Sequence, residues 1–117
     1  MSSYEIEEKE NERIFTPTFS KLALQREYES RELRHLKDYA DKNIVLNLKN
    51  ITYIDNFGIG ELISAYTSCS DRGSTIELMN VNKEIMDKLK MTKLDTVFPI
   101  RKQQKTSFQK KGKTKES

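Results

Sequence analysis

The polar side chains best placed for chemistry are Asp55 and Asn56, which directly follow an apolar segment and precede Phe57, Gly58 and a helical pattern. A carboxylate at this point has two uses: it can exchange protons with a substrate, or it can accept the free amides of a first helical turn. Acid–base work of the first kind relies on a partner group, and the sequence shows no obvious second acid beside Asp55. We therefore interpret Asp55 as a helix N-cap.

The other residue types that carry chemistry lack partners at a useful spacing. Gly58 and Gly60 are not followed by the Gly-Lys-Ser/Thr of a phosphate-binding loop, so we assign them to close helix–strand packing and helix-start geometry. His35, the one histidine, has no ligand-spaced acid pair or cysteine, which excludes a zinc site. Cys69 lies on an apolar stripe without a basic neighbour and is interpreted as an inert buried thiol. The sequence thus predicts neither catalytic residues nor a metal or cofactor.

Strands and helices alternate along the chain. Residues 4–19 predict one or two strands, with Pro17 at a sheet edge or a bulge because proline cannot donate a ladder hydrogen bond. Helical spacing of Leu33, Leu36 and Ala40 predicts a helix over residues 27–40. The remaining expected elements are strands 44–48, 51–54, 75–81 and 96–100, a helix from Asn56 to about Asp71 that stops at Gly73, and a helix after Asn82 with Ile85, Met86 and Leu89 buried.

This order predicts an α/β fold, because strand–helix alternation favours parallel strands joined by crossover helices. A chain of 117 residues has room for one domain. We expect a small mixed sheet of four to five strands with helices packed on it, formed by residues 1–100. One cysteine, no bilayer-length apolar run and no recognisable signal peptide favour a cytoplasmic protein.

The charge is unevenly distributed. Residues 101–117 contain seven basic residues and one acidic residue, a net charge of +6, which leaves −3 for residues 1–100 of a total of +3. A basic tail can bind nucleic acid or an acidic membrane surface. Because it contains one aromatic residue and no apolar pattern, we favour a solvated, disordered tail.

The helix after Asp55 has two predicted faces. At 100° per residue, one apolar stripe should pack on the sheet, and it consists of Ile59, Leu62, Ile63, Tyr66 and Cys69. The opposite side contains Phe57, Glu61, Ser64 and Ser68. Phe57 is then either a solvent-facing aromatic anchor of the kind found in binding hot spots, or it folds back over the strand end or the N-terminal segment.

The segment of about residues 43–100 resembles a STAS domain, the fold of bacterial anti-sigma factor antagonists. The resemblance rests on Ile44-Val-Leu-Asn-Leu, Ile-Thr-Tyr-Ile-Asp55, Gly58-Ile-Gly-Glu-Leu62, the helix up to Gly73, and the closing stretch 86–100. It is weaker before residue 43, where the family usually has a Gly-Glu-Leu-Asp-like turn and this chain has Ser20-Lys-Leu-Ala23.

In regulatory members of the family the motif reads Asp-Ser-Ser-Gly, and the resemblance implies that the second Ser is phosphorylated by a partner kinase that is also the anti-sigma factor. Asp55, Asn56, Phe57 and Gly58 match these four positions. Phe57 has no hydroxyl and cannot accept a phosphoryl group. Three modes then remain open: permanent binding, control by abundance or by another protein, or phosphorylation moved to Ser64 or Thr52.

The resemblance implies a non-catalytic binding module in a partner-switching pathway that regulates transcription. Its expected partner is an anti-sigma factor or GHKL-type serine kinase, and its expected contact surface is Asp55, Asn56, Phe57, Gly58, Glu61 and Ser64. The alternative is a STAS scaffold or accessory subunit of a signalling complex or transporter, which a gene neighbourhood of transporter components would favour. An enzyme or nucleotide binder has little support from the residues.

Overall fold

The N-terminal stretch forms an antiparallel pair of strands in the computed structural model, which describes residues 2–101. β1 (Tyr4–Glu8) pairs with β2 (Glu12–Pro17), from Tyr4 opposite Pro17 to Glu8 opposite Arg13. This confirms the strands predicted over residues 4–19. The prediction of an edge or bulge for Pro17 is wrong, because β2 lies inside the sheet between β1 and β4. Pro17 is tolerated as the last residue of β2, where the ladder ends.

The remaining strands of the main sheet run parallel to β2. β4 (Asn43–Asn47) pairs with β2 on one side and with β6 (Ile76–Met79) on the other, which gives the order β1-β2-β4-β6. The side chains of Ile44, Val45 and Leu46 are fully buried, so the prediction of an interior strand is confirmed. β6 is shorter than the predicted strand 75–81, since the backbone turns at Asn80 with a φ of 57°.

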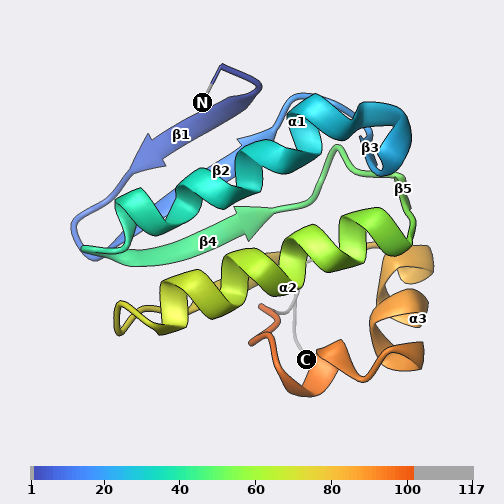
Figure 1. Ribbon diagram of the computed structural model, residues 1–117. Coiled ribbons are helices and arrows are strands. Elements are labelled where there is room, and N and C mark those ends of the chain that lie inside the picture. The colour runs from blue at the N-terminus through green and yellow to red at the C-terminus, as the bar shows by residue number, and fades with distance from the viewer. Residues whose placement is uncertain (1, 102–117) are drawn as a thin grey trace, which may run out of the picture.

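A second, two-stranded sheet lies at the end of the molecule where the main helix begins. β3 (Lys21–Leu22) pairs in parallel with β5 (Tyr53–Ile54), so only the last two residues of the predicted strand 51–54 are extended and paired. Figure 1 shows these strands beside the start of α2 (Asn56–Ser70), with α3 (Lys83–Met91) below them. Along the chain, β3 links β2 to the helical turn Leu24–Arg26 and β5 links β4 to α2, so the small sheet lies where the chain leaves the main sheet and enters these helices.

The predicted helix 27–40 is divided into two helical types. A short 3₁₀ turn, η1 (Leu24–Arg26), leads into α1 (Glu27–Arg31), and the chain continues as a 3₁₀ helix, η2 (Glu32–Tyr39). Leu33, Leu36 and Tyr39 are spaced three residues apart, the period of a 3₁₀ helix, so all three face the sheet. The expected continuous α-helix is thus wrong in type beyond Arg31.

The predicted last strand, 96–100, is reduced to one bridge. Residues Leu94–Thr96 form the 3₁₀ helix η3, and Ile100 makes a single parallel bridge to Leu78. Pro99 cannot donate a hydrogen bond, but its carbonyl accepts the N–H of Leu78 at 2.8 Å. Arg101, which the sequence assigned to the tail, forms ion pairs with Glu77 (2.7 Å) and Glu12 (3.0 Å). The rest of the predicted disordered tail, residues 102–117, lies outside the described residues.

The helices gather on one face of the main sheet. In Figure 1, α1 with η2 lies in front of β2, and α2 runs beside it, below β4. The ring of Phe15 on β2 packs edge-to-face against Tyr39 of η2 at 5.2 Å, and Tyr66 of α2 packs likewise against Phe98 at 5.1 Å. The core is therefore a layer between the sheet and these helices, as an α/β layer fold requires.

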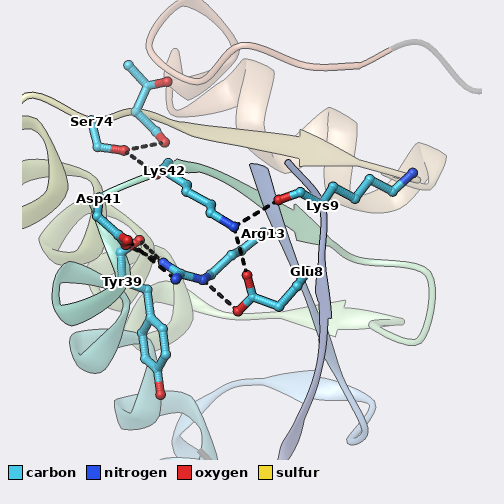
Figure 2. Close-up of polar contacts among 8 residues, drawn as sticks. Glu8, Lys9, Arg13, Tyr39, Asp41, Lys42 and Ser74 are labelled. Atoms are coloured by element: carbon cyan, nitrogen blue, oxygen red, sulfur yellow. Dashed lines mark hydrogen bonds and ion pairs between the residues drawn. The ribbon is translucent and has the colours of Figure 1, made fainter. Parts of the chain in front are cut away.

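Arg13 joins the β1–β2 hairpin to the link between η2 and β4 (Figure 2). Its guanidinium donates hydrogen bonds to Glu8 at 2.7 Å, to the carbonyl of Tyr39 at 3.0 Å and to the carboxylate of Asp41. Lys42 donates to Glu8 at 3.2 Å and to the carbonyl of Lys9 at 2.9 Å. Hydrogen bonds from Arg13 lower the pKa of both Glu8 and Asp41 below their ordinary values of 4.5 and 3.8.

We predict that acid weakens the fold through this cluster. A carboxyl group whose pKa is depressed by folding stabilises the protein above its unfolded pKa, and that contribution is lost as the pH falls through the folded value. Tm should therefore decrease as the pH drops below about 4.5, the ordinary value for glutamate. In Arg13→Met the decrease should be smaller, and Tm at pH 7 should already be lower. Thermal melts by circular dichroism between pH 3 and pH 7 measure both effects.

The matched control is Lys83→Met, which removes the exposed Lys83–Asp87 ion pair of α3. Exposed pairs of this kind contribute little, so its pH profile should follow that of the wild type. A profile of Arg13→Met that parallels the wild type would contradict the assignment.

Candidate functional site

Asp55 caps α2 and joins it to the preceding turn. One carboxylate oxygen accepts the N–H of Gly58 at 2.9 Å, and the other accepts the N–H of Leu24 at 3.1 Å. The N-cap predicted from the sequence is therefore confirmed. Because both oxygens accept backbone amides, Asp55 fixes the position of η1 relative to the first turn of α2.

Gly58 is the point of closest approach between α2 and the small sheet. A Cβ atom at this position would overlap the carbonyl oxygen of Leu22 and lie 2.6 Å from its carbonyl carbon and 2.9 Å from Ile54 Cγ1. Close helix–strand packing is thus the reason for glycine at 58. The same interpretation is wrong for Gly60, where an added Cβ meets no atom of the described chain within 4 Å.

The buried face of α2 differs from the predicted apolar stripe. Ile59, Leu62 and Cys69 are buried as expected, and Tyr66 is half-buried. Ile63 is 43% exposed and Glu61 is 6% exposed, so both were assigned to the wrong side. The small residues Gly58 and Ala65 lie on the buried arc and let α2 approach η2 and the sheet closely, which turns Glu61 inward and Ile63 outward.

Phe57 is half-buried at the first turn of α2, between the two orientations that the sequence left open. The guanidinium of Arg31, at the end of α1, lies over its ring at 5.1 Å from the centroid. Arg31 is itself held by an ion pair with Glu27 at 2.8 Å. A cation over an aromatic face is attracted by the ring quadrupole, so Arg31 and Phe57 restrain each other.

Glu61 holds α2 against η2. Its two carboxylate oxygens accept hydrogen bonds from Nε and Nη2 of Arg34, both at 3.2 Å. The side chain of Glu61 is 8% exposed, whereas the side chain of Arg34 is 53% exposed. Glu61 is therefore a structural contact within the domain rather than part of an outer surface.

This asymmetry leads to a second prediction. Arg34→Ala should leave the buried Glu61 carboxylate without its donor and lower the free energy of unfolding by about 1–3 kcal/mol. Glu61→Gln keeps one acceptor oxygen for Arg34 and removes the buried charge, while its amide nitrogen only donates. Its cost should therefore be smaller than that of Arg34→Ala. Urea unfolding of the two variants measures the difference, and equal costs would contradict this account.

The hydroxyl groups considered for a relocated switch differ in their contacts. Ser64 is exposed on α2, two turns beyond Phe57, whereas the Thr52 hydroxyl donates to the carbonyl of Ser20 at 3.3 Å. Asn56 is exposed at the first position of α2. Of the other candidates, His35 lies 3.9 Å from Asp38 on the surface, and burial raises the pKa of the Cys69 thiol.

Two kinds of feature are absent within residues 2–101. The acids, His35 and Cys69 form no group of three that could hold a metal ion there. None of the helices in this part of the chain has the length and apolar character that crossing a bilayer requires.

Sequence reasoning missed the apolar side chains exposed around the start of α2. Leu24 is 60% exposed, Tyr53 48% and Met91 82%. They line two hollows that meet at Tyr53, one with Leu24 and Asp55 and the other with Ile85 and Met91. Tyr53 lies in the expected strand 51–54 and Met91 in the expected helix after Asn82, while Leu24 lies outside the expected elements. None of these positions signalled exposure, because exposure depends on how β5 and α3 lie beside one another.

A mixed sheet covered by helices on one face, with a capped helix directly after β5, defines an α/β layer domain of the STAS type. The chain belongs to the STAS domain family, whose profile matches residues 4–107. Members of this family are non-catalytic, in agreement with the interpretation of Asp55 as a cap. The expected fold class is also confirmed by solved structures.

Three similar proteins illustrate the relationship. A stretch of 59 residues is 30% identical to the anti-sigma F factor antagonist of Paenibacillus polymyxa, covering 50% of each chain, so the match spans about half the length of that curated relative. A candidate anti-sigma factor antagonist from Thermotoga maritima has a TM-score of 0.71 at 23% identity, with 83% of this chain and 84% of that chain covered. A STAS protein from Planctomyces limnophilus, an anti-sigma-factor antagonist, has a TM-score of 0.72 at 13% identity, with 83% and 87% covered.

Proposed function

We propose that this chain is a cytoplasmic, anti-sigma factor antagonist-like module that binds its partner through the region around the start of α2 and thereby regulates transcription. The partner is an anti-sigma factor or GHKL-type serine kinase. Family membership and the similarity to the P. polymyxa protein support this role. The observation that carries the proposal is the first turn of α2, where Asp55 caps the helix, Phe57 is half-buried and Gly58 accepts no larger side chain. In the proposed match to the family motif, Phe57 takes the place of the phosphoacceptor.

The six proposed partner-binding residues divide into two groups. The first group makes contacts inside the domain. Asp55 accepts the amides of Leu24 and Gly58, Gly58 packs against the Leu22 carbonyl, and Glu61 accepts hydrogen bonds from Arg34. These three residues hold the first turns of α2 in place and so determine the shape of the proposed binding surface. Asn56, Ser64 and the accessible part of Phe57 are available for direct contact.

The partner switch differs from the one that the motif implies. A phosphate adds a charge of about −1.5 to −2 and disrupts an apolar interface, but Phe57 cannot accept one. Ser64 has an exposed hydroxyl and is the better placed of the two alternative phosphosites, because the Thr52 hydroxyl already donates to Ser20. We propose that the complex is permanent unless Ser64 is modified.

The test is incubation of the chain with the purified GHKL-type serine kinase of the source organism and ATP, followed by intact-mass and peptide mass spectrometry. A stable complex with unmodified wild-type chain supports a binder without the usual switch. Phosphate on Ser64 or Thr52 shows a relocated switch. No association between the two proteins, measured by calorimetry with and without ATP, overturns the proposed function.

A further inference from the structure

The main sheet has a second face, turned away from the helices, and acidic side chains lie on it. Strand pairing places one row across all four strands, which consists of Glu7, Ile14, Val45 and Glu77. Because alternate residues of a strand share a face, Glu5 and Glu12 lie on the same side as this row. We call these six residues the outer face.

No helix of residues 2–101 packs on the outer face. Ile14 and Val45 are buried, yet they are not part of the hydrophobic core between the sheet and the helices. The cover is a charged side chain that arrives from the end of the described chain. Arg101 pairs with Glu77 of β6 at 2.7 Å and with Glu12 of β2 at 3.0 Å, so its guanidinium spans β4, which lies between these strands.

The β1 side of the outer face keeps an excess of negative charge. Glu5 and Glu7 are exposed and form no ion pair within residues 2–101. Two cations share the face with its four glutamates: Arg101, and Lys9, which follows β1 opposite Glu12. Four negative and two positive charges leave −2, so a second copy of this face would be repelled and a basic segment would be attracted.

The chain itself supplies a basic segment at this place. The N–H of Arg101 donates to the carbonyl of Leu78 at 2.7 Å, which fixes the end of the described chain beside β6. Residues 102–117 follow directly and contain six lysines and one glutamate, a net charge of +5. Their basic character continues that of Arg101, the residue that already binds two outer-face carboxylates.

The segment is long enough to cross the sheet. From Arg101 over β6, β4 and β2 to β1 there are four strand spacings, a distance of about 19 Å. Six extended residues span about 20 Å, and the segment has sixteen.

We propose that residues 102–117 fold back across the outer face and bind it through their lysines, with Glu5 and Glu7 as the main carboxylates. Exposed ion pairs are individually weak, but the covalent link to Arg101 gives the segment a high effective concentration at this face. The contact requires no single conformation, because any of the lysines can pair with either carboxylate. Another basic partner of the outer face has to displace this segment first.

A nitroxide spin label at Ser107→Cys in the full chain tests the contact, because it broadens the amide NMR signals of residues close to it. Cys69 is fully buried, so the introduced thiol is the one that reacts. The amide signals of β1 and β2 should lose about half or more of their intensity at low salt and recover it at high salt, since salt screens exposed charges. The signals of η2, on the opposite face of the sheet, should be affected less.

The double variant Glu5→Lys/Glu7→Lys should abolish this broadening. Its matched control is Glu84→Lys/Asp87→Lys, which makes the same change of charge at two exposed acids of α3 and should keep it. Equal broadening on both faces of the sheet, or broadening that persists in Glu5→Lys/Glu7→Lys, would overturn the proposal. So would broadening that appears only when isotope-labelled chain without nitroxide is mixed with nitroxide-bearing chain, because the contact would then join two copies.

Discussion

Gly58→Ala is expected to unfold a large fraction of the protein or to lower its free energy of unfolding by about 3 kcal/mol, the upper range for overpacking. The added methyl group would overlap the Leu22 carbonyl oxygen and lie 2.6 Å from the carbonyl carbon. Both are backbone atoms, and β3 cannot retreat without breaking its pairing with β5 or the hydrogen bond from the Leu24 amide to Asp55. Urea unfolding followed by circular dichroism measures the loss.

Gly60→Ala is the matched control for this prediction. It stands two residues further along the same helix, and an added Cβ meets no described atom within 4 Å. Replacing glycine by alanine inside a helix stabilises it by about 0.5–1 kcal/mol, so this variant should be slightly more stable than the wild type. Similar losses for both variants would show that the first turns of α2 require glycine for another reason.

Local signals in the sequence were sufficient for the elements that depend on local chemistry. Asp55 and Asn82 cap α2 and α3 by accepting amides three residues ahead, and Gly73 follows α2 with a φ of 79°. The continuous apolar run 44–48 identified the central strand β4. Each of these features is determined by neighbours in the sequence, and so the α/β layer fold could be predicted without coordinates.

The errors occur where distant segments decide the outcome. Glu61 was assigned to solvent because its type is polar, yet Arg34, 27 residues earlier, makes its burial possible. Ile63 was assigned to the core because its type is apolar, yet the approach permitted by Gly58 rotates the buried arc of α2 away from it. Helical periodicity defines the width of a buried face but not its centre when small residues permit close packing.

The candidate site shows the same division. The match of Asp55–Gly58 to the family motif stays a prediction from the sequence, whereas the contacts around these residues come from the structure alone. Arg31 covers the Phe57 ring from α1, and the hollows around Tyr53 require β5 and α3 to lie together. The half-buried Phe57 ring is restrained by the Arg31 guanidinium. This favours a partner-binding surface that keeps one conformation over one that phosphorylation changes.

Phe57→Ser is expected to introduce a phosphorylation switch at the first turn of α2, where the wild-type chain has no hydroxyl side chain. The new hydroxyl would stand at the first turn of α2, where a phosphate is favoured by the helix N-terminus and by Arg31, whose guanidinium lies 5.1 Å from the present ring centroid. Incubation with the GHKL-type kinase and ATP should add one phosphate to the introduced hydroxyl, detected by peptide mass spectrometry. Calorimetry should show the modified form binding the kinase about tenfold or more weakly, since an apolar contact becomes a desolvated charge.

The control for this switch is Phe57→Ala, which lacks both the ring and the hydroxyl. It should remain unmodified and retain its affinity for the kinase when ATP is added, because no acceptor stands at the first turn of α2. If Phe57→Ser stays unmodified while still binding the kinase, position 57 does not face the kinase active site.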